Sequence, residues 1–236
     1  MGKQKRDWGM DAIERRILSK LLLLVAAYAL GVMIGGSMQK LEAVSHHAKV
    51  AEKNKIAITF DDGPNPEYTM KLLDGLQKRG VKATFFVLGS EVEKYPDIVK
   101  AIDAQGHLIG VHSYEHVNFS QIGDEAALEQ IEKTQDAIHD VTGNYAGYIR
   151  PPYGCWKKSL DVEVSLIEVL WDIDPLDWAT RDADTVVQRI LKGVPDGSII
   201  LLHDASASSV QAAFTTIDIL QKENYEFVTV EELLLE

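Results

Sequence analysis

Short apolar stretches alternate with amphipathic ones along the chain from residue 55 onward. Seven apolar, β-branched stretches have the length and composition of strands, at 55–60, 82–89, 107–112, 147–152, 167–174, 197–204 and 225–230. Between most of them apolar residues recur at helical spacing, which predicts helices over 69–80, 95–106, 124–143, 182–193 and 209–224. Strands that alternate with helices predict an α/β fold with a parallel sheet, and about seven strands favour a (β/α) barrel or near-barrel over an open sheet.

The first part of the chain has a different pattern. Residues 21–38, "LLLLVAAYALGVMIGGSM", carry no charge, and residues 1–20 before them hold six Lys and Arg against three Asp and Glu. As a helix the uncharged run spans about 27 Å, close to the hydrocarbon thickness of a bilayer. The pattern predicts one N-terminal transmembrane signal-anchor with residues 1–20 in the cytoplasm. A buried soluble helix and a cleaved signal peptide are the alternatives, but no clear Ala-x-Ala cleavage site follows the run.

This predicted anchor sets the expected location of the remaining chain. Residues 39–54 are polar, carry mixed charge and are typical of a short stalk, and residues 55–236 are long enough for one large domain. We therefore expect a single-pass protein of the cell membrane with its globular domain on the extracytoplasmic side. A stalk of this length keeps that domain within about 50 Å of the membrane.

Composition narrows the classes of partner and site. The chain has 46% hydrophobic and 25% charged residues and a formal net charge of -12. Such an acidic chain argues against a nucleic-acid partner, because phosphate binding requires a basic surface. Cys155 is the single cysteine, so the chain can form neither an internal disulfide framework nor a Cys-based zinc site.

Polar side chains with catalytic chemistry follow five of the predicted strands. In parallel α/β folds the functional residues collect beyond the carboxyl ends of the strands. The candidates at these ends are Asp61, Asp62, His112, His116, Arg150, Tyr153, Asp174, Asp177, Trp178, His203 and Asp204. Their recurrence at five strand ends predicts a functional site at one rim of the sheet.

The stretch "TFDDGP" (59–64) places two carboxylates side by side. Asp, Gly and Pro all favour turns, so a plain turn is one interpretation. Neighbouring residues of an extended segment point in opposite directions, and Asp61 and Asp62 could then serve two different partners.

The stretch "HSYEH" (112–116) separates two histidines by four positions. On a helical turn both imidazoles would lie on one face and could share a metal ion. A pair of capping or core histidines is the alternative, and Glu115 is not placed where zincin proteases have their base. With a carboxylate from residues 61–62 the pair would form a two-His, one-carboxylate site. Three protein ligands leave positions open for water and substrate, as catalytic zinc requires.

Three further stretches each have a structural and a functional interpretation. "RPPYG" (150–154) is a rigid loop, or its Arg150 orients a carboxylate. "WDIDPLDW" (171–178) is a strand end with a turn, or it supplies an Asp that keeps a neighbouring His protonated. His203 in "LLHDA" (201–205) is, taken alone, more often a structural residue.

Together the five stretches resemble the polysaccharide deacetylase domain of carbohydrate esterase family 4. The resemblance covers roughly residues 54–236, with the motifs in the family's order and spacing. It implies a distorted (β/α) barrel with fewer than eight strands. It also implies that Asp61 is the general base, that Asp62, His112 and His116 bind the metal ion, and that Arg150 orients the base.

The resemblance assigns the other five motif positions as well. Tyr153 would offer its backbone N–H to the oxyanion, and Trp178 and Leu201 would form the pocket for the acetyl group. His203 would be the general acid, and Asp177 would tune its pKa. No motif position is replaced in this chain, which argues against an inactive relative.

These features imply a metal-dependent hydrolase that removes acetyl groups from N-acetylated sugars of a polysaccharide. A zinc ion is expected, with cobalt, nickel or manganese as alternatives. The predicted location suggests peptidoglycan as the substrate, and chitin oligomers or O-acetylated xylan are the alternatives within the family. A non-catalytic protein that binds or anchors wall glycan is the rival from another class.

Overall fold

The computed structural model describes residues 53–162 and 164–235, together with residues 20, 22, 23 and 26 near the N-terminus. Within these described residues no helix is both long and apolar enough to cross a membrane. The predicted basic segment 1–20, anchor 21–38 and stalk 39–54 lie almost entirely outside the described residues, and they remain predictions.

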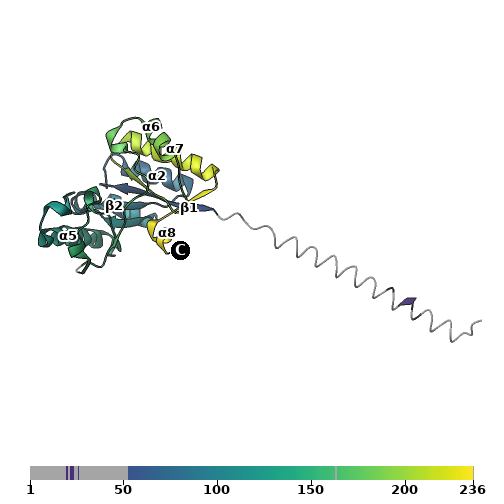
Figure 1. Ribbon diagram of the computed structural model, residues 1–236, viewed down its shortest axis with the longest axis horizontal. Helices are drawn as coiled ribbons and strands as arrows, with labels where there is room; N and C mark the ends of the chain where they lie inside the picture. The colour runs from purple at the N-terminus through teal and green to yellow at the C-terminus, as the bar shows by residue number, and fades with distance from the viewer. Residues whose placement is uncertain (1–19, 21, 24–25, 27–52, 163, 236) are drawn as a thin grey trace, which may run out of the picture. The chain divides into compact units, whose positions relative to one another are not determined.

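Seven parallel strands form one sheet, which curls into a half-barrel (Figure 1). The strands are β1 Asn54–Asp61, β2 Thr84–Val87, β3 Leu108–Val111, β4 Tyr148–Ile149, β5 Ile167–Glu168, β6 Ile199–His203 and β7 Tyr225–Val228. Their order is β5-β4-β3-β2-β1-β6, and β7 also pairs with β1. The prediction of about seven parallel strands is therefore confirmed.

The strand β1 lies at the centre of this sheet. Along one edge it pairs with β6 over Ala57–Asp61. Along the other edge its first half pairs with β7 and its second half with β2. Ile173, a few residues beyond β5, forms an isolated parallel bridge to Ile200 of β6. This bridge links the chain that leaves one edge of the sheet to the strand at the other edge.

The predicted strands over 147–152 and 167–174 are much shorter in the structure. Only Tyr148 and Ile149 pair in the first, because the prolines at 151 and 152 lack the N–H that a strand ladder requires. Only Ile167 and Glu168 pair in the second. The chain then leaves β4 and approaches β6, where the N–H groups of Asp172 and Ile173 donate to the Ile199 carbonyl.

Seven helices of the described chain surround the sheet: α2 Thr69–Arg79, α3 Gly89–Lys94, α4 Pro96–Ala104, α5 Asp124–Thr142, α6 Ala183–Ile190, α7 Ala207–Lys222 and α8 Val230–Leu234. The helices pack on one another in a row: α6 packs on α7, α7 on α2, α2 on α4, and α4 on α5. Figure 1 shows α6, α7 and α2 together in the upper part of the domain and α5 at its lower left. All five predicted helices are present, whereas α3 and α8, each only one to two turns long, were not predicted.

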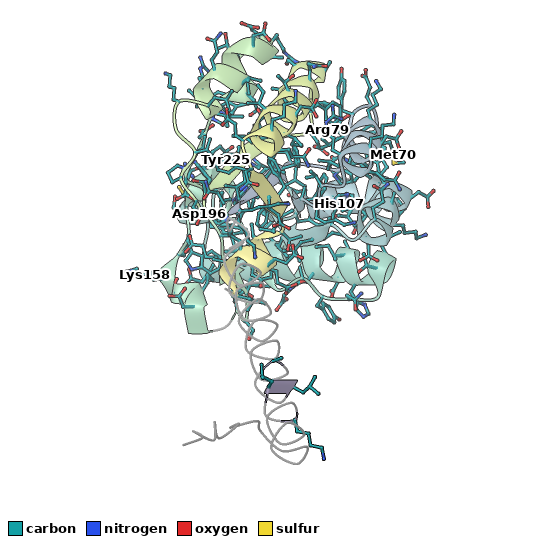
Figure 2. All side chains as sticks on the ribbon, turned by 90° about the vertical axis from the view of Figure 1, so that its right-hand side faces the viewer. Met70, Arg79, His107, Lys158, Asp196 and Tyr225 are labelled. Carbon is teal, nitrogen blue, oxygen red and sulfur yellow. The ribbon has the colours of Figure 1, made fainter. Side chains whose placement is uncertain are left out.

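The packing of α2 against α7 depends on a glycine and an ion pair. A Cβ atom added at Gly75 would lie 2.0 Å from the ring of Phe214, so only glycine allows the two helices to approach this closely. Arg79, labelled in Figure 2, covers the same ring and donates to both carboxylate oxygens of Asp218 at 2.7 and 2.9 Å. The two helices are thus fixed by packing and by a paired hydrogen bond.

A buried histidine inside the fold gives a pH-dependence of stability. His107, labelled in Figure 2, is 6% exposed, and its Nδ1 accepts a hydrogen bond from the Ala83 N–H at 3.2 Å. Burial, together with the charge of Lys82, lowers the pKa of His107 to about 4, against 6.5 in the unfolded chain. The unfolded chain therefore binds more protons between these two values, so stability should fall as the pH drops from 6.5 towards 4.

We expect this histidine to contribute at most about 3 kcal/mol to the acid loss of stability. His107→Gln, whose side-chain oxygen can still accept the Ala83 N–H, should flatten the dependence of the unfolding free energy on pH over that range. His139→Gln is the control, because the His139 side chain is 41% exposed. Urea unfolding at several pH values measures both, and equal slopes for His107→Gln and the parent chain would contradict the assignment.

Candidate active site

The register of the strands brings the predicted site residues together at one rim. Asp61 and His203 are paired neighbours at the carboxyl ends of β1 and β6. The residues just before His112 and Arg150 pair across β3 and β4, which places these two side chains at adjacent strand ends. Four side chains from four strands therefore meet where parallel strands end, as the sequence predicted.

Asp62, His112 and His116 form a cluster that could hold a metal ion. Their ligand atoms lie within 4.8 Å of one another. Asp62 Oδ1 lies 3.3 Å from His112 Nε2 and 3.4 Å from His116 Nε2. Burial alone would raise the pKa of Asp62, but contact with His112 and the charges of the surrounding histidines lower it. The cluster thus favours an ionised carboxylate facing two imidazole nitrogens.

Two features of the cluster test whether a divalent cation fits. Asp62 Oδ1 is buried and has no hydrogen-bond partner among the described residues, which is costly unless a cation or a proton compensates it. His112 Nδ1 lies 2.6 Å from the Arg150 carbonyl oxygen, so Nδ1 donates and the Nε2 lone pair faces the cluster. Burial lowers the pKa of His116, which favours the neutral imidazole that metals bind. The residues fit a metal ion.

The expected helical turn at residues 112–116 is wrong. His112 directly follows β3, and the next four residues form no helix. Ser113 and His116 have φ values of 65° and 57°, in the left-handed region. The two imidazole rings nevertheless lie 5.2 Å apart between centroids. Their proximity therefore comes from a tight irregular loop. The sequence does not indicate this loop, because Ser113 and His116 are not glycines and such residues rarely adopt a positive φ.

The opposite orientation of the two aspartates also has a different cause from the one predicted. Asp61 ends β1, but Asp62 has a φ of 70° and is not extended. This left-handed residue turns its carboxylate towards the two histidines, while Asp61 faces Arg150. Both carboxylates lie near His112, but only Asp61 bonds to Arg150 and only Asp62 contacts His116. The extended geometry expected for Asp62 is wrong.

Arg150 holds the Asp61 carboxylate inside the protein. Its side chain is 0% exposed, and Nη1 donates to Asp61 Oδ1 at 2.8 Å and to the Thr59 hydroxyl at 2.6 Å. The carbonyl oxygens of Val169 and Leu170 accept its other hydrogen bonds. Burial lowers the pKa of Arg150, and the Asp61 charge opposes that effect. One oxygen of Asp61 is therefore fixed, and the other, Oδ2, lies 3.8 Å from His112 Nε2 at the edge of the cluster.

His203 and Asp177 form a second hydrogen-bonded pair beside the cluster. His203 Nδ1 lies 2.8 Å from Asp177 Oδ1, and the His203 backbone N–H donates to Asp177 Oδ2 at 2.9 Å. Burial alone would lower the pKa of His203, but the hydrogen bond and charge of Asp177, with Asp61 and Asp62, raise it to about 9. The Nε2 atom of His203 faces the cluster, 3.9 Å from Asp62 Oδ2.

A cleft of about 460 Å³ lies over these groups. It is lined by Asp61, Asp62, His112, His116, Tyr153, Trp171, Asp174, Trp178, Leu201 and His203. Leu201 is buried at its floor, whereas Tyr153 and Trp178 are 65% and 67% exposed. No described residue accepts a hydrogen bond from the Tyr153 backbone N–H, so this donor is available to a ligand.

Two further residues shape the cleft: Trp171, which was not among the candidates from the sequence, and Asp174, which was a candidate without an assigned role. Trp171 lines the cleft, although its position predicted only a strand. Asp174 also lines it, and its Oδ1 accepts a hydrogen bond from the Leu176 N–H at 2.8 Å. Their inward placement depends on the chain leaving the sheet after residue 168, and the apolar pattern gave no sign of that departure.

Another carboxyl group, that of Asp204, lies beneath the turn that carries Asp62. It is 1% exposed, the Thr69 hydroxyl donates to its Oδ2, and a Cβ added at Gly63 would lie 2.6 Å from that oxygen. Burial raises the pKa of Asp204 to about 6, with the charge of Asp62 adding to it and Thr69 opposing it. Gly63 is therefore required for the turn to pack against this group.

The remaining residues of the loop after "RPPYG" have structural contacts. Trp156 packs edge-on against Phe119, and its Nε1 donates to Asp161 at 2.6 Å. Lys157 donates to the Ile122 carbonyl at 2.8 Å and pairs with the carboxylate of Asp124 at the start of α5. None of these residues lines the cleft. Cys155 is a half-buried free thiol.

The chain is similar in sequence to one family of known proteins. A protein family described as polysaccharide deacetylase matches residues 48–167. Peptidoglycan-N-acetylglucosamine deacetylase PgdA of Listeria monocytogenes is 40% identical over 185 residues, which cover 78% of this chain and 40% of PgdA. A chitooligosaccharide deacetylase of Rhizobium leguminosarum bv. trifolii is 38% identical over 157 residues, 65% of this chain and 73% of the relative.

A deacetylase of known structure has the same fold. The structure of peptidoglycan deacetylase PdaC from Bacillus subtilis superposes with a TM-score of 0.75 at 40% identity, covering 77% of this chain and 90% of the solved chain. The complete PdaC is named a peptidoglycan-N-acetylmuramic acid deacetylase. The chain spans about two fifths of the length of PgdA and of PdaC.

Proposed function

Because the chain belongs to the polysaccharide deacetylase family, we propose that its domain hydrolyses the N-acetyl groups of sugars in a polysaccharide. One observation carries the proposal: two adjacent aspartates in one cleft share His112 as a neighbour, but each has a further partner of its own. Asp61 is fixed by Arg150, and Asp62 faces His112 and His116. A plain turn would require neither partner.

The residues of the chain divide the chemistry of amide hydrolysis among them. Asp61, with one oxygen held by Arg150, accepts a proton from the water that attacks the carbonyl carbon. The Tyr153 backbone N–H donates to the oxygen that develops negative charge. His203, held through Nδ1 by Asp177, donates a proton from Nε2 to the nitrogen as the carbon–nitrogen bond breaks. Acetate and a free amine are the products.

Asp62, His112 and His116 would hold a divalent metal ion. When bound there, such an ion supplies Lewis-acid polarisation of the carbonyl group and lowers the pKa of a water molecule. Two imidazoles and one carboxylate are a donor set that suits zinc, with cobalt, nickel or manganese as alternatives. Trp178 and Leu201 line the same cleft, where they would enclose the acetyl methyl group.

Peptidoglycan is the substrate that we favour. PgdA and PdaC, each 40% identical to this chain over the matched residues, are named for the N-acetylglucosamine and the N-acetylmuramic acid of peptidoglycan. A chitin oligomer is the alternative that the Rhizobium relative supports. O-acetylated xylan is the further alternative within the family that the motifs resemble. All of these substrates present an acetyl group on a sugar to the same cleft.

A peptidoglycan substrate agrees with the predicted extracytoplasmic, membrane-anchored location. The support is the uncharged run over residues 21–38 and the basic residues before it. Fractionation of cells with N-terminal sequencing of the membrane-bound protein tests this part. A mature N-terminus beyond residue 38 would exclude the uncleaved anchor.

Acetate release from a panel of glycans tests the function. The full chain, loaded with zinc, is incubated with peptidoglycan, chitin oligomers and acetylated xylan, and free acetate is measured before and after removal of the metal with a chelator. We expect metal-dependent release, fastest from peptidoglycan. Binding to glycan without acetate release from any substrate would overturn the proposal in favour of a non-catalytic wall-binding protein.

A further inference from the structure

The short segment 113–116, which connects β3 to the second candidate histidine ligand, is held through its backbone from two sides. On the first side the N–H groups of Gly89 and Ser90, at the start of α3, donate to the carbonyl oxygens of Ser113 and Tyr114, each at 3.1 Å. The segment has no helix or strand hydrogen bonds of its own, so these contacts with a neighbouring element determine its path.

The second side is formed by one side chain of α5. Gln130 Oε1 accepts hydrogen bonds from the backbone N–H groups of Tyr114 at 3.0 Å and of Glu115 at 2.9 Å. A single amide oxygen thus satisfies two successive N–H groups of the segment. Gln130 follows Glu115 by 15 residues and Tyr114 by 16, and it lies in none of the five motifs.

His116 depends on this segment for its orientation more than His112 does. The ring of His112 is fixed by its hydrogen bond to the Arg150 carbonyl, and the residue directly follows a strand. His116 has a φ of 57°, and no described residue forms a hydrogen bond with its Nδ1. Its ring contacts the edge of Tyr153, an exposed side chain. The backbone of the preceding residues therefore determines where His116 Nε2 points.

We propose that Gln130 is a positioning residue for the metal site, which fixes the 113–116 backbone so that His116 Nε2 meets Asp62. This inference rests on the proposed metal-dependent function. Groups that orient a metal ligand typically change metal affinity by 10- to 100-fold when they are removed. Gln130 acts in this way on the backbone of the ligand segment rather than on an imidazole nitrogen.

Two substitutions separate the hydrogen bonds from the size of the side chain. Gln130→Leu keeps the volume but removes the acceptor, whereas Gln130→Glu keeps an oxygen that can accept both N–H groups. In the full chain we expect Gln130→Leu to weaken zinc binding about 10- to 100-fold and to change the visible absorption spectrum of the cobalt-substituted protein. Gln130→Glu should stay within about threefold of the parent affinity, with the parent spectrum.

Gln135 provides a matched control on the same helix. Its side chain also holds a loop backbone, through hydrogen bonds at 2.9 Å to both the N–H and the carbonyl of Ala146, and neither residue lines the cleft. Gln135→Leu should lower the melting temperature of the metal-free protein without changing zinc affinity or the cobalt spectrum. Competition with a chromophoric chelator gives the affinities.

The proposal is overturned if Gln130→Leu keeps parent zinc affinity, or if Gln135→Leu weakens zinc binding equally. Failure of Gln130→Glu to restore the affinity also overturns it. Its failure can be distinguished from that of the proposed function. A parent chain that binds zinc at Asp62, His112 and His116 but releases no acetate would refute the enzyme and leave the role of Gln130 intact. A parent chain that binds no zinc overturns both.

Discussion

Asp61→Asn should retain zinc within a few-fold of the parent affinity and still lose deacetylation by about 10²- to 10⁴-fold, the range of a positioned general base. Asp61 contacts Arg150 and is not one of the three candidate ligands. Asparagine can still accept the hydrogen bond from Arg150 but cannot take up a proton. Turnover on the best glycan of the panel and zinc content measure the two effects.

Asp62→Ala, the neighbouring substitution, should have the opposite phenotype. It removes one of three ligands, so zinc affinity should fall by more than about 100-fold, and activity should be partly recovered at high zinc concentration. If Asp61→Asn empties the site and Asp62→Ala keeps it filled, the two roles are reversed. If both variants keep metal and activity, the stretch is only a turn.

Folding must be checked for Asp61→Asn in particular. Arg150 is fully buried, and removing the charge of its partner leaves an uncompensated cation inside the protein. Breaking a buried ion pair typically costs about 3–5 kcal/mol, although the retained hydrogen bond should reduce that cost here. Circular dichroism and melting of the metal-free variants show whether a loss of activity reflects chemistry or unfolding.

His203→Ala should keep its metal and lose deacetylation by about 10²- to 10⁴-fold, because no acid remains to protonate the departing nitrogen. His203 is held by Asp177 through both its ring and its backbone N–H. Zinc content and turnover again measure the two properties. Equal turnover of variant and parent would remove His203 from the reaction.

Asp177→Asn tests the same pair through pH. The protonated form of His203 is the active one, so activity is present below its pKa and is lost as the pH rises through it. The hydrogen bond and charge of Asp177 raise that pKa. Removal of the charge should therefore move the alkaline limb of the pH–rate profile to lower pH. An unchanged limb would show that Asp177 does not tune the histidine.

The residues of the site could be predicted where strand ends and motifs coincide. An apolar run followed by a polar residue marks the end of a buried strand, and parallel pairing then brings such ends together. This pattern located Asp61, His112, Arg150 and His203 correctly at the rim. It depends only on local sequence and on a general property of parallel sheets.

The contacts of the supporting residues could not be predicted, because they join distant parts of the chain. Nothing near Gln130 indicates that its amide oxygen meets the backbone of Tyr114. Asp204 likewise packs under Gly63, far away in the sequence. The left-handed conformation of His116 was equally hidden, since non-glycine residues rarely adopt it and only the surrounding fold imposes it.

The central strand is the first strand of this domain, yet its pairing is completed by the last two. One edge of β1 pairs with β6, and the first half of β1 pairs with β7, which ends at Val228. A nascent chain of 190 residues would already contain Asp61, both candidate histidine ligands and Arg150, but not the strand that places His203 beside Asp61. Such pairings between distant segments are slow to form. The candidate site is therefore assembled only after β6 and β7 have been synthesised, although most of its residues precede them in the chain.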